Sequence, residues 1–202
     1  MRIDPAGVQL LFVDLQAFLT SFSATESPDM IGKAAGALAR TARALGMPIS
    51  FSLVPGADAS PQPVPELQGF ATAANVFVRQ SASALLDPAL RGVLSDHSRK
   101  MLIIAGFSAE VAVLHAGLDA IEAGYQVYVV VDAIGGHSHR TEQAALNQLE
   151  RAGAKFISAI SLLSCFAPDF SKSPGTDVLK EIMALGAARA AYAKAGRGNV
   201  SV

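Results

Sequence analysis

Short runs of apolar residues alternate along the chain with longer stretches in which apolar residues recur every three or four positions. The short runs are typical of strands buried on both faces of a parallel sheet, and the longer stretches are typical of amphipathic helices. Strands are predicted at residues 8–13, 48–54, 75–78, 100–106, 126–131 and 154–158. Helices are predicted at residues 29–45, 85–96, 111–121, 140–152 and 178–185.

This alternation of strands and helices requires crossover connections, and right-handed crossovers produce a parallel sheet. We therefore expect an α/β fold with three layers and a six-stranded, mainly parallel, Rossmann-like sheet of order 3-2-1-4-5-6. In that order the residues that follow the first and fourth strands meet at the topological switch point. Residues 1–173 are predicted to form the domain, and residues 174–202 to form a C-terminal helix with a mobile tail that contacts another subunit.

Composition narrows the class of protein. The 202 residues are 51% hydrophobic and 16% charged, with a formal net charge of -1, which excludes a disordered chain and shows no basic stripe for nucleic acid. No apolar run is long enough for a membrane span, and the N-terminus lacks the apolar core of a signal peptide. We therefore expect a cytoplasmic protein whose partners include neither nucleic acid nor membrane. The single cysteine, Cys165, excludes an internal disulfide and a cysteine-based zinc site.

The mean hydropathy of +0.37 is high for a small domain. So much apolar surface indicates that part of it is buried between subunits. A homo-oligomer, dimeric, tetrameric or larger, is therefore expected.

Polar residues follow three of the predicted strands. Asp14 ends the first strand and Gln16 follows it, Arg79 ends the third strand, and residues 106–113 lead from the fourth strand into a helix. A carboxylate and a cation facing the start of a helix are suited to stabilising an oxyanion intermediate. The alternative is that Asp14 only caps a turn and that Arg79 is a surface charge.

Other polar motifs give weaker predictions. His137 and His139 lie in a glycine-rich loop with only Asp132 nearby, and a metal site needs three or four convergent ligands. We expect a surface loop there and no metal. Neither GxGxxG nor GxxxxGK occurs, so no nucleotide cofactor, and no other cofactor, is predicted.

Three segments resemble the isochorismatase-like cysteine hydrolases, which include nicotinamidases, N-carbamoylsarcosine amidases and isochorismatases. LLFVDLQAF at residues 10–18 resembles the first strand of that family, with its catalytic aspartate and the glutamine after it. LIIAGFSAEVAVLHAGLDAIEAGYQVYVVVDAIGG at residues 102–136 resembles the family signature, and QAALNQLERAGAKFISAISLLSC also fits. The resemblance covers most of residues 8–166 and implies a hydrolase that acts on a small molecule.

The resemblance also implies roles for individual residues. In that family a cysteine attacks a carbonyl or nitrile carbon, an aspartate takes its proton, and a lysine assists. These three catalytic positions fall on Ala112, Asp14 and Arg79 of this chain. A cis peptide is implied between Phe107 and Ser108, with the amides of Ser108 and Ala112 forming an oxyanion hole. Gln16 and Arg79 become candidate substrate-binding residues.

Alanine at position 112 is the most important difference from the family pattern, because a methyl group can neither ionise nor attack a substrate carbon. Cys165 does not replace the missing thiol, because it follows the sixth strand with no adjacent base and is expected to be a small buried hydrophobe.

Three interpretations remain open. The chain is a hydrolase without a thiol nucleophile, as true isochorismatases are, with Asp14 as general acid or base if burial raises its pKa. Alternatively it is a catalytically silent member that binds a small ligand or partner, or an engineered Cys-to-Ala variant of a thiol amidohydrolase.

Overall fold

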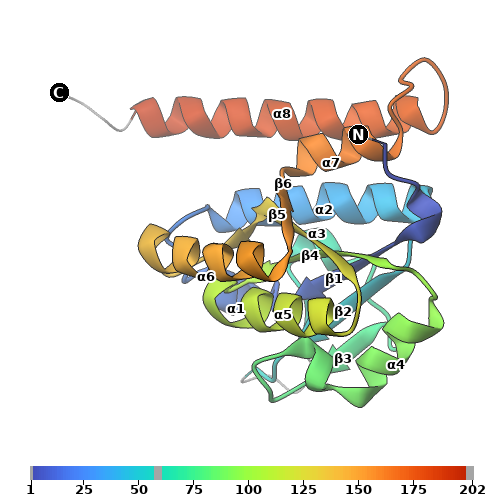
Figure 1. Cartoon of the computed structure of the whole chain (residues 1–202). Coiled ribbons are helices and arrows are strands. Elements are labelled where there is room, and N and C mark those ends of the chain that lie inside the picture. Colours follow the sequence, from blue (N-terminus) through green and yellow to red (C-terminus); the bar gives the residue numbers. More distant parts are fainter. Residues whose placement is uncertain (1, 57–60, 199–202) are drawn as a thin grey trace.

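The computed structural model describes residues 2–56 and 61–198, which form one six-stranded parallel sheet covered by helices on both faces (Figure 1). The sheet has the order β3-β2-β1-β4-β5-β6, so the predicted α/β fold and strand order are confirmed. The strands are β1 (Val8–Val13), β2 (Ile49–Leu53), β3 (Val76–Val78), β4 (Met101–Phe107), β5 (Gln126–Gly135) and β6 (Lys155–Ile157).

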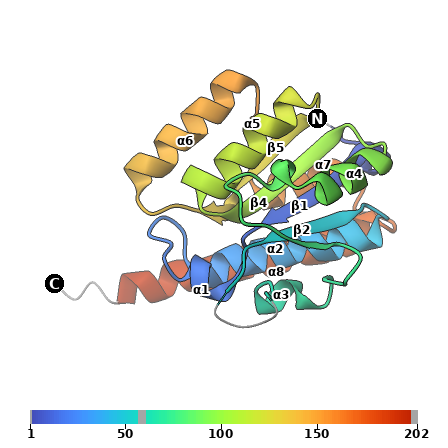
Figure 2. The same cartoon turned by 90° about the horizontal axis from the view of Figure 1, so that it is seen from below.

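Helices connect the strands and form the outer layers. The α-helices are α1 (Ala17–Thr20), α2 (Pro28–Ala44), α3 (Pro65–Gln68), α4 (Pro88–Asp96), α5 (Leu114–Glu122), α6 (His139–Ala152), α7 (Ala159–Phe166) and α8 (Gly175–Gly198). Shorter turns are the 3-10 helices η1 (Pro5–Gly7) and η2 (Ala84–Leu86) and the π-helix η3 (Ala109–Val113). Figure 2 shows α5 and α6 over one face of the sheet, and α2 and α8 over the other.

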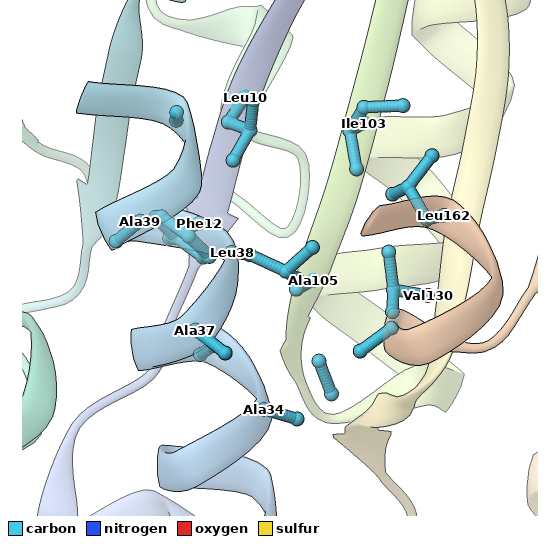
Figure 3. Packing of buried hydrophobic residues seen from close by; sticks show 14 of the residues in the cluster. Leu10, Phe12, Ala34, Ala37, Leu38, Ala39, Ile103, Ala105, Val130 and Leu162 are labelled. Atoms are coloured by element: carbon cyan, nitrogen blue, oxygen red, sulfur yellow. The ribbon is translucent and has the colours of Figure 1, made fainter. Parts of the chain in front are cut away.

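The first strand contributes to the core on both faces, as expected for a strand inside a parallel sheet. Leu10 and Phe12 belong to the apolar cluster under α2 and α7, and Figure 3 shows them beside residues of α2. Leu11 and Val13 belong to the cluster under α4, α5 and α6. All six residues of β1 are buried, which places the end of this strand in the middle of the molecule.

The C-terminal helix lies outside this three-layer unit, over α2 and α7 (Figure 1). Arg40 of α2 pairs with Glu181 at 2.8 Å, and Arg189 of α8 pairs with Asp132 of β5 at 2.9 Å. The helix continues to Gly198, well past the predicted end at residue 185, and alanine, the best helix former, is the commonest of the added residues, at six of thirteen. The rest of the predicted tail, residues 199–202, lies outside the described residues.

Other elements also differ from the sequence prediction, among them the short helices α1 and α3, which were not predicted. Helix α7 was not predicted, although Ser158 caps it by accepting a hydrogen bond from the amide of Ser161. The predicted helix over residues 85–96 is divided into η2 and α4, because Pro88 begins a new helix capped by Asp87. Strand β5 continues to Gly135 through a register shift against Ile104 and Gly106 of β4. None of the helices in the described ranges has the combination of length and hydropathy that a membrane-spanning helix needs.

Candidate active site

The ends of β1 and β4 come together at the switch point of the sheet. Val13 is the register partner of Gly106, and a Cβ on Gly106 would collide with the carbonyl oxygen and the side chain of Val13. Only glycine permits this approach, which places Asp14 beside the turn that begins at Phe107. Asp14 itself has φ +53°, in the left-handed region that aspartate tolerates better than most residues.

Asp14 and Arg79 form a buried ion pair. Nη1 of Arg79 lies 2.7 Å from one carboxylate oxygen of Asp14, and Nη2 lies 2.8 Å from the other. The side chains are only 9% and 3% exposed for Asp14 and Arg79, respectively. Two parallel hydrogen bonds between a guanidinium and a carboxylate fix the orientation of both groups.

Strand β2 and the turn after β3 complete the hydrogen bonding of this pair. Nη1 of Arg79 also donates to Oγ of Ser52 at 3.1 Å, and Nη2 donates to the carbonyl of Ala82 at 3.4 Å. The carbonyl of Ser52 accepts the amide N–H of Asp14 at 2.9 Å. Nε of Arg79 is buried and has no partner among the described residues, so one of the five guanidinium donors is left over.

Burial raises the pKa of Asp14, while the hydrogen bonds and the positive charge of Arg79 lower it, and the net direction is upward from the ordinary aspartate value. Removing a carboxylate from water penalises its charged form, which is why burial acts in this direction. A carboxylate whose pKa is raised is a stronger base than an exposed aspartate, and Asp14 therefore suits proton transfer.

The turn after β4 lies next to this pair. The peptide bond between Phe107 and Ser108 is cis, and the Ser108 carbonyl accepts from the amides of Val111 and Val113 at 3.3 and 3.2 Å. Ala112 is buried in η3 with 1% exposure. The structure thus places Phe107, Ser108 and Ala112 on one turn whose preceding strand pairs with the strand that carries Asp14.

Gln16 supports the turn after β1. Its Nε2 donates to the carbonyl of Val54 at 3.0 Å, and its Oε1 accepts the amide of Val54 at the same distance. These two bonds extend the pairing between β1 and β2 beyond the strands. Gln16 therefore holds the backbone of this turn, and its role in binding a substrate stays a prediction.

Glu110 lies in the same turn as Ala112, and sequence reasoning missed it as well as Ser52. Its Oε1 accepts from the amide of His137 at 2.8 Å and from Oγ1 of Thr141 at 2.7 Å. Burial raises the pKa of Glu110, but hydrogen bonds, first among them that of Thr141, outweigh burial, so the net direction is downward. An acidic residue at the start of a helix is a favourable arrangement, and this pattern in the sequence was the available signal.

The remaining sequence candidates lie elsewhere or have structural partners. Cys165 is half-buried in α7 and packs with the cluster under α2 and α7, on the opposite face of the sheet from Ala112. Asp132 accepts from the amide of Ala159 at 2.7 Å and pairs with Arg189. No cluster of three or more potential metal ligands occurs in the part of the chain that the structure describes.

Comparison with known proteins adds a family relationship to this geometry. Residues 8–161 match the model of the isochorismatase domain family. The chain is 31% identical over 162 residues to the probable hydrolase YcaC of Escherichia coli K12, which covers 78% of this chain and 76% of that protein.

Two solved structures have closely similar folds. YcaC of Escherichia coli, an octameric hydrolase of unknown specificity, superposes with a TM-score of 0.83 and 26% identity, covering 96% of this chain and 97% of that chain. YcaC from Pseudomonas aeruginosa with hexane-2,5-diol and covalent acrylamide superposes with a TM-score of 0.82 and 28% identity, covering 95% and 97%.

Proposed function

This chain belongs to the isochorismatase domain family, and from that premise we propose that it is a hydrolase that acts on a small molecule without a thiol nucleophile. The observation that carries the proposal is the buried pair of Asp14 and Arg79 at the switch point, where Asp14 follows β1, the strand that pairs with β4 just before the turn holding Ala112. A side chain able to move a proton is present there, and position 112 provides only a methyl group.

Asp14 acts as the general acid and base. Paired with a guanidinium, it is ionised and takes a proton from a water molecule as the water oxygen forms a bond to the substrate carbon. The bond from that carbon to the leaving group then breaks, and Asp14 returns the proton to the leaving group. The sum is addition of one water molecule across the bond that is cleaved.

Arg79 holds Asp14 in place and balances its charge through the two hydrogen bonds of 2.7 and 2.8 Å. Because a guanidinium stays protonated near neutral pH, Arg79 does not carry the proton. The amides of Ser108 and Ala112 are the proposed donors to the oxyanion that forms on the substrate. Preorganised donors of this kind stabilise the transition state more than the ground state.

The experiment is a hydrolysis screen on the parent protein and two matched variants. Ammonia release reports on amides and carbamoyl compounds, and pyruvate release reports on isochorismate. We expect turnover in the parent that falls by about 100-fold or more in Asp14→Asn. Asp132→Asn is the control, because Asp132 is also a buried carboxylate paired with an arginine.

The control separates chemistry from folding. Asp132→Asn should keep activity within severalfold of the parent per folded molecule. Silence of the parent across the whole panel would contradict the proposal and favour a catalytically silent member. A thiol-dependent activity that appears only in Ala112→Cys would indicate that thiol chemistry has been lost from this chain.

We also propose that the chain forms a homo-oligomer. Met183 and Tyr192 of α8 are 65% and 52% exposed, which is unusual for large apolar side chains on the outermost helix. The related YcaC of Escherichia coli is octameric. Light scattering should give a particle mass that is a multiple of 20.9 kDa, and a mass of 20.9 kDa itself would contradict the proposal.

A further inference from the structure

The segment between α1 and α2, residues 21–27, is held by the turn that follows β5. The amide of Ala24 donates to the carbonyl of Gly136 at 2.9 Å, and the amide of Gly136 donates to Oγ1 of Thr25 at 2.8 Å. Oγ1 of Thr25 donates in turn to Oε2 of Glu142, in the first turn of α6, at 2.6 Å. Three hydrogen bonds therefore fasten this α1–α2 segment to the start of the connection between β5 and α6.

The same turn also contacts η3 of the candidate site. The amide of His137 donates to Oε1 of Glu110 at 2.8 Å, and a Cβ on Gly136 would lie 2.9 Å from that oxygen. A Cβ on Gly135 would collide with Oγ of Ser23 in the α1–α2 segment. Glycine at these two positions therefore lets both η3 and the segment pack closely against the end of β5, so the segment lies beside the candidate site.

The C-terminal helix reaches the end of this segment. Glu181 pairs with Arg40 in the last part of α2, whereas Arg189 lies near Glu26, just before α2 begins, so α8 runs antiparallel to α2 (Figure 1). Nη1 of Arg189 donates to Oε2 of Glu26 at 3.4 Å. Oε1 of Glu26 accepts the amide of Ser27, the residue that caps α2, at 2.9 Å. Arg189 therefore connects α8 with the place where the α1–α2 segment joins α2.

Arg189 also marks the place where α8 leaves the rest of the fold. Its Nη2 lies 2.9 Å from Oδ2 of Asp132 in an ion pair, although Nη2 makes no well-directed hydrogen bond among the described residues. The side chain of Arg189 is 34% exposed, and residues 190–195 after it are all exposed. Both Figure 1 and Figure 2 show the last turns of α8 extending past the sheet. The contact with Glu26 is thus made at the end of the packed part of the helix.

We propose that Arg189 is a clamp through which the position of α8 sets the order of the α1–α2 segment beside the candidate site. Val178 and Leu185 are buried under α8, so the helix stays packed when the charge of Arg189 is removed. Loss of the clamp therefore frees the segment without unfolding the helix. The inference rests on the proposed function only for the importance of the site, because the clamp acts whether or not hydrolysis follows.

The test measures hydrogen–deuterium exchange of the parent and its variants by mass spectrometry at one protein concentration. Peptides containing Ala24 and Gly136 report on the segment, because the amides of these residues are bonded across it. A peptide containing Leu10 reports on the sheet, because its amide donates to the carbonyl of Pro48 at 2.9 Å. In Arg189→Met, exchange at Ala24 and Gly136 should be about fivefold faster, since a partly exposed ion pair contributes modestly to local order. Exchange at Leu10 should be unchanged.

Three variants test the cause of this acceleration. Glu26→Gln removes the charge that Arg189 meets and keeps an acceptor for the amide of Ser27. It should accelerate exchange as much as Arg189→Met, and the double variant should be no faster than either, because both changes remove one interaction. Arg40→Met removes the other ion pair between α8 and α2, and Asp132→Asn leaves the contact with Glu26 in place. Both controls should stay within about twofold of the parent.

The outcomes separate this inference from the proposed function. Unchanged exchange in Arg189→Met, or an equal acceleration in Arg40→Met, would overturn the clamp. Additive effects of Arg189→Met and Glu26→Gln would overturn it as well, because Arg189 would then act through another group. An acceleration that extends to Leu10 would show that Arg189 supports the whole fold and would also contradict the inference. Faster exchange confined to the segment, without turnover of any compound by the parent, would support the clamp and overturn the hydrolase proposal.

Discussion

Replacement of Arg79 by methionine removes the guanidinium and keeps an unbranched apolar side chain. The carboxylate of Asp14, whose side chain is 9% exposed, then loses both of its charge-assisted hydrogen bonds and stays buried. Breaking a buried ion pair on one side costs about 3–5 kcal/mol of unfolding free energy. With a denaturant slope of about 2 kcal/mol per molar urea, the unfolding midpoint should fall by roughly 2 M.

Arg40→Met is the matched control for Arg79→Met. Arg40 also makes a two-oxygen contact, with Glu181, but its side chain is 42% exposed. An exposed pair of this kind contributes about 0–1 kcal/mol, so the control should lose little stability. Urea unfolding is followed by circular dichroism at one protomer concentration, because subunit association would also change the midpoint.

A double-mutant cycle identifies the partner responsible. Asn replaces Asp14 because it tolerates the left-handed backbone at this position. In the double variant of Asp14→Asn and Arg79→Met no charge remains buried, so the combined loss should be smaller than the sum of the single losses by about 1–3 kcal/mol. Additive losses, or an Arg79→Met no less stable than Arg40→Met, would refute the reasoning.

Three further predictions concern pH and packing. Since the pKa of Asp14 is raised, the hydrolysis rate of the parent should rise with pH over a range that lies above the ordinary aspartate pKa. A rate that instead falls as pH rises in this range would assign Asp14 as the acid of the rate-limiting step. The lowered pKa of Glu110 stabilises the fold at pH values above the ordinary glutamate pKa, and this stabilisation is lost as pH falls through the lower pKa of the folded state. In Glu110→Gln the melting temperature should therefore fall less on acidification than it does in the parent. Gly106→Ala should destabilise the fold by at least about 2 kcal/mol because its Cβ meets the Val13 backbone, whereas Gly117→Ala should cost less, since its Cβ meets the flexible end of Leu149. Equal losses of unfolding free energy in these two glycine variants would contradict the last prediction.

Much of the fold was predictable because the apolar pattern reports burial directly. Residues 10–13 and 101–105 are apolar at every position, which only a strand covered on both faces requires. Helix α7 and the far end of β5 were missed for the same reason. The run after Ser158 is only eight residues long and has only Ser161 and Ser164 as polar positions, too few to reveal its period. Asp132 interrupts an apolar strand because its partner Arg189 is 57 residues away.

The sequence predicted which residues lie at the candidate site, but not how they interact. The strand order located Asp14, Arg79 and the turn from Phe107 at one edge of the sheet, because parallel strands present their carboxyl ends together. The sequence could not show that Arg79 binds Asp14 through both oxygens, or that Ser52 and Ala82 take its other donors.

Sequence alone therefore determined the layers, the strand order and which residues gather at the switch point, since these follow from local periodicity and the handedness of crossovers. Tertiary structure decided the chemistry available there. Whether a guanidinium receives a ligand or neutralises a neighbouring carboxylate depends on distances between residues 65 positions apart, and on how far both are removed from water. Those distances arise only when β1, β2 and β3 pack side by side in one sheet.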